Sequence, residues 1–334
     1  MTGVLKQLAN RSKSVTILFR IYDNWRLRRQ INSGNIETVH GSTHTRKSTE
    51  ESLRYINSQF EDYLNYSGLS AQQLAGKTIL ELGFGDNLGV ALKFIAAGAK
   101  RVVCLDRFYS ARDTAHQVEI YSALRQMLSE DEKARFDSAI KIGSEIELHG
   151  AVQCIYGTSL EQVADETVRN QQKFDLIISR AVLEEIYEPD STFSAMNRLL
   201  ASGGYLLHKI DLSDYGIFRD RGMHPLTFLT IPDWIYRLMA SDAGIPNRRR
   251  IGYYQRRMAE LGYDAKFFVT SVLGTGPLEP HKQALESNID YSQATLDLIS
   301  QVRPQLSRKF RHLNDEELLI DGIFMVARRA EKTD

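Results

Sequence analysis

The sequence predicts an α/β protein with a parallel sheet covered by helices on both faces. From residue 77 onward, apolar runs typical of strands alternate with helical stretches, and this alternation is the pattern of a parallel sheet. A turn containing Gly83 and Gly85 joins the first run to the first helix, and the second run ends on Asp106. The runs expected to form strands are 78–82, 101–106, 152–156, 174–179, 205–210, 265–270 and 318–327.

The turn at residues 81–89, ELGFGDNLG, has the features of a ligand-binding loop. Gly83 and Gly85 allow the chain to turn tightly and to bring backbone N–H groups close to a ligand. Asp86 or Asn87 is expected to cap the helix that follows. The spacing differs from the G-x-G-x-x-G of dinucleotide-binding loops, so the glycines alone do not identify the ligand.

Two acidic residues narrow the choice of ligand. Glu81 lies two residues before the first glycine, at the carboxyl end of its strand, where a bound diphosphate would be repelled. A nicotinamide-dependent oxidoreductase is therefore disfavoured, and an adenosyl ligand that carries positive charge is favoured. Asp106 ends the next strand, where a carboxylate can accept hydrogen bonds from both ribose hydroxyls.

Composition and charge exclude several classes of protein. The 334 residues include 42 Lys/Arg and 42 Asp/Glu, so no net charge draws the chain to nucleic acid or to a membrane. No run approaches the ~18 apolar residues of a membrane span, and the pattern of a secretory signal is not seen. Cys104 and Cys154 lie in apolar runs and are expected to be buried, reduced thiols. We expect a cytoplasmic protein.

Residues 1–31 are unusually basic. They hold seven Lys/Arg against the single acid Asp23, and apolar residues recur at helical spacing. Two interpretations are open. The helix can pack on the main domain with a solvated basic face, or it can make a weak contact with an anionic membrane surface. The second interpretation would place the protein at the inner face of the membrane.

The chain is expected to divide into an extension and one main domain. In the extension, Ser48 and Glu51 match the S-x-x-E capping box, which predicts a helix that Gly68 ends. The expected units are a helical extension at 1–71 with a candidate lid at 32–50, and a main domain at 72–330 with an irregular acceptor-site insertion at about 211–250 and a helical insertion at about 281–314.

The order of four motifs resembles the class I S-adenosylmethionine-dependent methyltransferases. These motifs are ELGFGDN, VCLD, FDLIISRAVLEEI and RLLASGGYLLH. The resemblance covers roughly residues 72–330 and implies S-adenosylmethionine as cofactor. It also implies a Rossmann-like sheet of seven strands, mostly parallel, with the last strand antiparallel. Asn87 departs from the family pattern, because many members carry a third glycine there.

The resemblance implies a place for each part of the cofactor. The methionine moiety would lie at the glycine turn, the ribose at the end of the second strand and the adenine after the third strand. The reacting sulfur would lie near the end of the fourth strand. The expected cofactor residues are Glu81, Gly83, Gly85, Asp86, Asn87, Asp106, Arg107, Thr158, Ser159, Leu160, Ser179 and Arg180.

The stretch GGYLLHKIDLSDY, residues 203–215, contains the fifth predicted strand, and the candidate base His208 lies at its end. A histidine can take a proton near neutral pH and a carboxylate can orient it, so His208 and Asp211 are expected to be catalytic. A histidine that only shapes the strand end is the alternative. The H-x-I-D-L-x-D pattern is similar to a methyltransferase subgroup associated with bacterial sugar and polysaccharide gene clusters. The residues expected to bind the acceptor are Asp214, His224, Trp234, Asn247, Arg248 and Arg250.

These features predict O-methylation of a small molecule or of a glycan or sugar-type acceptor. No metal is expected, because Glu185 stands where metal-binding relatives carry a histidine. A nucleic-acid methyltransferase is the second hypothesis, but the amino-directed kind carries [DN]-P-P-[YF] where this chain has SRAV, so no nucleic-acid partner is expected. A non-catalytic interaction protein is the third. The oligomeric state and the atom that is methylated do not follow from the sequence.

Overall fold

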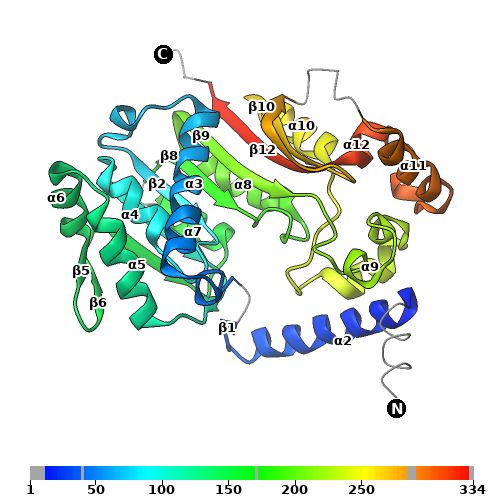
Figure 1. The fold of residues 1–334 in the computed structure, drawn as a ribbon, viewed down its shortest axis with the longest axis horizontal. Coiled ribbons are helices and arrows are strands. Elements are labelled where there is room, and N and C mark those ends of the chain that lie inside the picture. The colour runs from blue at the N-terminus through cyan, green and yellow to red at the C-terminus, as the bar shows by residue number, and fades with distance from the viewer. Residues whose placement is uncertain (1–11, 39–40, 170–171, 284–290, 331–334) are drawn as a thin grey trace.

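A computed structural model describes residues 12–38, 41–169, 172–283 and 291–330. An eight-stranded sheet forms its centre, in the order β11-β10-β12-β9-β8-β2-β3-β7 (Figure 1). Its strands are β2 (Thr78–Leu82), β3 (Arg101–Asp106), β7 (Val152–Tyr156), β8 (Phe174–Arg180), β9 (Leu200–Asp211), β10 (Tyr263–Val272), β11 (Gly276–Gln283) and β12 (Ile320–Arg329). The predicted α/β fold with a mostly parallel sheet is confirmed.

The far edge of the sheet differs from the prediction. The last strand, β12, runs antiparallel to both of its neighbours, as expected. The count of seven strands was wrong, because β11 pairs with β10 and adds an eighth. This strand contains Pro277 and Pro280, which supply no backbone donor and suit an edge strand, so its sequence lacks a strand pattern. The segment expected to be helical at 281–314 therefore begins as strand, and residues 284–290 lie outside the described residues.

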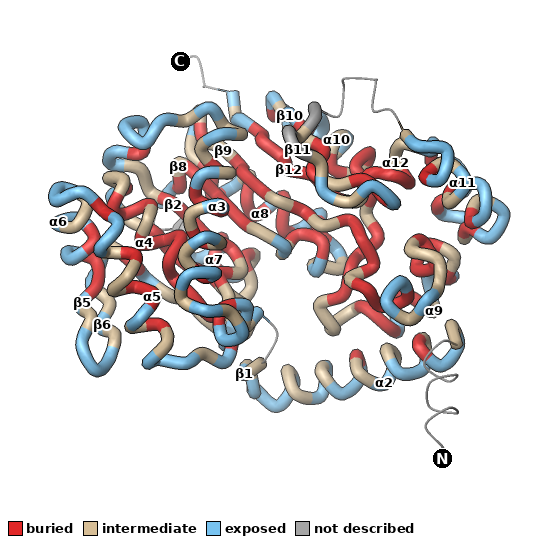
Figure 2. Tube along the Cα trace, in the orientation of Figure 1, coloured by how far each residue is buried: buried red, intermediate tan, exposed pale blue. Residues whose placement is uncertain are grey.

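Helices cover both faces of the sheet and enclose two apolar cores. Ile79 and Leu80 are neighbours on β2 but belong to different cores, because successive side chains of a strand point to opposite faces. Figure 2 shows the central strands as the most buried part of the chain. The helices are α2 (Lys13–Asn32), α3 (Thr49–Ser67), α4 (Gly89–Ala96), α5 (Thr114–Gln126), α6 (Glu130–Ala139), α7 (Leu160–Arg169), α8 (Pro189–Leu199), α9 (Asp233–Ala240), α10 (Ile251–Glu260), α11 (Gln293–Val302) and α12 (Asp315–Leu319).

The N-terminal region supplies two helices with different surroundings. Helix α3 begins after Ser48, whose side chain forms the predicted capping box with Glu51, and ends at Gly68 in the left-handed conformation. It packs on the sheet. Helix α2 runs along the edge of the molecule beside α9 (Figure 1), and residues 1–11 of the predicted basic segment lie outside the described residues. No helix in the described part of the chain has the length and apolarity to cross a bilayer.

Candidate cofactor and acceptor site

A cavity of about 860 Å³ lies at the carboxyl ends of β2, β3, β7 and β8. This edge is where open α/β sheets bind their ligands, and the volume suits a small molecule. All but one of the expected cofactor residues line it. They are Glu81, Gly83, Gly85, Asp86, Asn87, Asp106, Arg107, Thr158, Ser159, Leu160 and Arg180. The structure therefore brings together the residues chosen from sequence, and their contact with cofactor stays a prediction.

The glycine turn that follows β2 requires its glycines for two reasons. Gly83 and Gly85 have φ of 67° and 62°, in the left-handed region that favours glycine. A Cβ atom at Gly83 would lie 2.3 Å from Cγ2 of Val182, and one at Gly85 would lie 2.6 Å from the carbonyl oxygen of Gly41. Both positions thus allow other parts of the chain to approach the floor of the cavity closely.

The next two residues of the turn have separate roles. The N-cap position of α4 is Leu88, so the expected cap by Asp86 or Asn87 is wrong. The carboxylate of Asp86 accepts hydrogen bonds from the backbone N–H of His44 at 3.0 Å and of Thr45 at 3.1 Å, so it fastens the N-terminal segment to the turn. Oδ1 of Asn87 accepts a hydrogen bond from the backbone N–H of Gly89, the first residue of α4, at 2.7 Å.

Glu81 is a buried carboxyl group at the base of the cavity. Burial raises its pKa to about 8. The thiol of Cys104 lies 3.7 Å from Oε2, and no described Lys or Arg forms an ion pair with it. A buried acid without a cation is costly to ionise. A ligand that carries an ammonium or sulfonium group would supply the missing positive charge, so this site fits S-adenosylmethionine.

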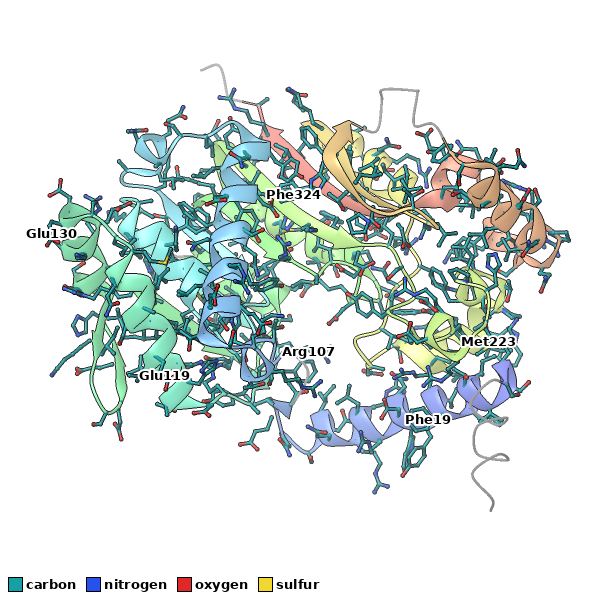
Figure 3. All side chains as sticks on the ribbon, in the orientation of Figure 1. Phe19, Arg107, Glu119, Glu130, Met223 and Phe324 are labelled. Atoms are coloured by element: carbon teal, nitrogen blue, oxygen red, sulfur yellow. The ribbon has the colours of Figure 1, made fainter. Side chains whose placement is uncertain are left out.

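Asp106 ends β3 and faces the same cavity. Its carboxylate accepts hydrogen bonds from the backbone N–H of Phe108 at 2.9 Å and of Gly85 at 3.3 Å. Burial is the main cause that raises its pKa. Each carboxylate oxygen has a second lone pair, so the hydroxyl pair of a ribose can still be accepted. Arg107 follows on the side of the molecule nearer α2 (Figure 3).

His208 does not fit the predicted role of general base. It is fully buried within β9 and does not line the cavity. Nδ1 shares a hydrogen bond of 2.7 Å with the hydroxyl of Ser179, the residue opposite it on β8. Burial lowers the pKa of His208 to about 3. The pair joins two strands, and this also explains why Ser179 is absent from the cavity wall.

The acidic residues and the histidine expected beside His208 stabilise turns instead. Oδ1 of Asp211 accepts a hydrogen bond from the N–H of Ser213. Asp214 accepts hydrogen bonds from the N–H groups of Gly216, Phe218 and Arg219. His224 bonds the carbonyl of Leu298 through Nε2 and the N–H of Leu226 through Nδ1. None of Asp211, Asp214 and His224 lines the cavity, so the catalytic and acceptor roles predicted for them do not fit.

Three of the predicted acceptor residues further along the chain bind backbone carbonyls of the fold, and the fourth, Trp234, is exposed. The guanidinium of Arg250 donates to the carbonyls of Leu212, Glu317, Leu318 and Ile320. Arg248 donates to two carbonyls and to Asp233, and its guanidinium carbon lies 3.8 Å from the ring centre of Tyr236. Asn247 Nδ2 donates to Leu183 O and Ile186 O. Trp234 is 69% exposed. Asn247, Arg248, Arg250 and Trp234 all lie outside the wall of this cavity, so their predicted contact with an acceptor is not supported by its geometry.

Two further residues of the cavity wall carry acid–base groups, and neither was predicted from the sequence to bind cofactor or acceptor. Glu185 is open to the cavity but surrounded by its walls, and this burial, with the charge of Asp106, raises the pKa of Glu185. Tyr215 lines the same cavity, and its buried hydroxyl lies beside the carboxyl groups of Glu184 and Glu185. Burial and the charges of Glu184 and Glu185 raise the pKa of Tyr215.

Two residues that line the cavity have an unusual, left-handed backbone conformation. Ala181 and Tyr215 line the cavity and have φ of 56° and 54°, values that are uncommon for residues with a Cβ. Such strain costs about 1–3 kcal/mol and gathers at functional sites. Nothing in the sequence indicates it, because neither residue is glycine or asparagine.

The outer rim of the cavity joins the N-terminal helix to the insertion at 211–250. Arg28 of α2 forms an ion pair with Asp242 at 2.9 Å, and Arg237 of α9 lies 3.8 Å from the carboxylate of Glu188. All four residues line the cavity. His44 also lines it and is buried, and its Nδ1 has no hydrogen-bond partner among the described residues. Helix α2 thus contributes to the site as well as to the outer surface.

Fold and site together define a class of protein. A mostly parallel sheet with an antiparallel last strand carries a glycine turn, a buried acid before it and an acid at the end of the next strand, all around one cavity. The family model for the methyltransferase domain matches residues 52–266, which is more than half of the chain. The chain belongs to this methyltransferase family, and S-adenosylmethionine is its cofactor.

Solved structures of low sequence identity resemble this chain. An S-adenosylmethionine-dependent methyltransferase from Mesorhizobium loti is 14% identical, with a TM-score of 0.40, over 82% of this chain and 100% of that one. Magnesium protoporphyrin IX methyltransferase from Synechocystis PCC 6803 is 12% identical, with a TM-score of 0.39, over 83% of each chain. No curated protein sequence matches. Among the described residues, no cluster of three or more His, Cys, Asp or Glu side chains could hold a metal ion.

Proposed function

We propose that this methyltransferase methylates a hydroxyl group of a small molecule or of a sugar-type acceptor. The observation that carries the proposal is the position of Glu185, a carboxyl group of raised pKa that opens into the cavity lined by the cofactor residues. A hydroxyl needs a proton acceptor when it is methylated, and an acid whose pKa lies near neutrality suits that task.

The residues around Glu185 support an assignment of roles. S-adenosylmethionine, when bound, supplies a methyl group activated by its sulfonium. Glu185 would accept the proton that the acceptor hydroxyl loses. Tyr215 would donate or accept a hydrogen bond that orients the acceptor, since its hydroxyl faces the cavity beside the carboxyl group of Glu185. The cavity of about 860 Å³ is large enough for cofactor and a small acceptor.

The test is methyl transfer by the purified protein to a panel of glycosides, nucleotide sugars and phenols, followed through formation of S-adenosylhomocysteine. Glu185→Gln should lower kcat by roughly 10²–10⁴-fold and leave the Kd of S-adenosylmethionine nearly unchanged. Glu188→Gln is the matched control, because Glu188 lines the same cavity and pairs with Arg237. Equal activity of the Glu185→Gln variant and the wild type would remove the proposed base.

A pH profile adds an independent check. Activity towards a hydroxyl acceptor should rise with pH as the Glu185 carboxyl ionises, with the midpoint above the ordinary range of a glutamate because its pKa is raised. Transfer only to amines, with no hydroxyl product in the panel, would contradict the proposed acceptor and leave the methyltransferase assignment intact.

A further inference from the structure

Helix α2 has an unusual distribution of side chains. Its packed face includes buried polar side chains, Thr16 and Asn24. Asn24 Nδ2 donates to the carbonyl of Leu238 and to the hydroxyl of Ser241, both at 3.0 Å. Asn24 Oδ1 also accepts from the backbone N–H of Asp242 at 2.8 Å. These contacts fix the rotation of the helix about its axis, so the side chains on its outer face are committed to face solvent.

The outer face of α2 is apolar and aromatic. Five large side chains on it are between 41% and 67% exposed, namely Val15, Leu18, Phe19, Tyr22 and Trp25. Figure 3 labels Phe19 on α2 at the edge of the molecule away from the sheet. Ile17 and Ile21, in contrast, are partly buried against the core. A contiguous exposed patch of this kind marks an interaction surface.

Positive charge lies within the same patch. Helix α2 carries five Lys/Arg against one aspartate. The guanidinium carbon of Arg29 lies 4.8 Å from the ring centre of Trp25, and Arg29 forms no ion pair with any described residue. Arg26 is two-thirds exposed and shares Asp23 with Arg20. The patch therefore combines aromatic rings with cations that have little or no acidic compensation.

We propose that this outer face docks on a membrane surface that contains anionic lipids. Tryptophan and tyrosine favour the headgroup level of a bilayer, leucine and phenylalanine favour the acyl boundary, and arginines attract phosphate groups. The positive charge of the patch would attract an anionic membrane surface and would repel a basic protein partner. Since α2 is anchored to the body through Asn24 and Arg28, the docked helix would hold the whole protein at the membrane.

The experiment is co-sedimentation of the full chain with vesicles of phosphatidylcholine, prepared with and without phosphatidylglycerol. The wild type should bind the vesicles that contain phosphatidylglycerol, and high salt should weaken the binding. The double variant Phe19→Ser/Trp25→Ser should bind at least roughly tenfold more weakly, because it loses two aromatic side chains that the bound wild type would bury in the membrane. Arg29→Gln should reduce the preference for the anionic lipid.

Met127→Ser is the matched control, since Met127 is 61% exposed and follows α5; it should bind like the wild type. Unchanged affinity for S-adenosylmethionine shows that the α2 variants are folded. Absence of vesicle binding, or binding that ignores phosphatidylglycerol, overturns the proposal. So does self-association of the wild type, seen by sedimentation velocity and lost in the double variant, without vesicle binding, because a protein partner would then cover the face.

Discussion

Nδ1 of His208 and the hydroxyl of Ser179 lie 2.7 Å apart inside the central sheet, on neighbouring parallel strands. This contact predicts a stability effect instead of a catalytic one. His208→Ala should lower the free energy of unfolding by about 2–5 kcal/mol, since it opens a cavity and leaves Ser179 unpartnered. Urea denaturation measures the loss, and His149→Ala, at an exposed histidine, should cost little.

His208→Asn, which keeps a polar group toward Ser179, should retain the wild-type pH profile of methyl transfer. A change in the profile, with stability preserved, would restore His208 as a base.

Asp106→Ala should weaken S-adenosylmethionine binding. Loss of charge-assisted hydrogen bonds to a ribose is worth about 1–3 kcal/mol, or roughly 5–150-fold in Kd. Isothermal titration calorimetry gives the value directly. Asp113→Ala provides a control on the connection that follows β3, because Asp113 only accepts a hydrogen bond from the N–H of His116 at the start of α5. An unchanged Kd for Asp106→Ala would refute the ribose assignment.

The cofactor-free protein should lose stability as pH rises from 6.5 to 8. The pKa of Glu81 and that of Glu184 are each raised to about 8 by burial, from an ordinary 4.5. The unfolded chain therefore releases protons that the folded chain retains, and stability falls with pH by up to about 1.4 kcal/mol per unit for each carboxyl.

Two buried histidines affect stability in a different pH range. The pKa of His44 is lowered to about 4 and that of His208 to about 3, so their contribution is lost only as pH falls below 6.5. Thermal denaturation at several pH values tests the slope of stability between pH 6.5 and 8. Glu184→Gln should make this slope shallower, and the remaining slope is then due to Glu81. Constant stability across this range would show that the carboxyls ionise without cost.

Arg250→Lys should destabilise the fold. The guanidinium of Arg250 donates to four backbone carbonyls, including Glu317 O and Leu318 O at 2.9 Å, and an ammonium cannot reach all of them. The expected loss is about 3 kcal/mol or more, measured by urea denaturation. Arg249→Lys in the same run of arginines should be nearly neutral. A stable Arg250→Lys variant with a raised KM for acceptor would instead indicate a binding role.

The cofactor half of the site was predictable because it depends on local signals. An apolar run predicts a strand, and the glycines and the acid that follow it identify the carboxyl end of that strand. The carboxyl ends of parallel strands meet at one edge, so Glu81, Gly83, Gly85 and Asp106 had to converge. Strand β11 was not predicted, because Pro277 and Pro280 interrupt the residue pattern of a strand in this edge segment.

The acceptor half was not predictable for a chemical reason. A carboxylate after a strand can serve as a base or can accept backbone N–H groups, and Asp214 does the latter. The sequence predicts that Arg248 and Arg250 bind the acceptor, but their guanidinium groups donate hydrogen bonds to backbone carbonyls of the protein itself. Glu185 and Tyr215 come together only through tertiary structure, since helix α8 and strand β9 lie between them in the chain.

The fastening of the N-terminal segment to the glycine turn bears on how the chain can be shortened. The family match begins at residue 52, whereas the amides of His44 and Thr45 that bind Asp86, and the Gly41 carbonyl that lies against Gly85, come earlier. A truncated protein that starts at the match would expose Asp86 and open one wall of the cofactor cavity. The smallest fragment able to hold cofactor tightly therefore includes residues that the family signature omits.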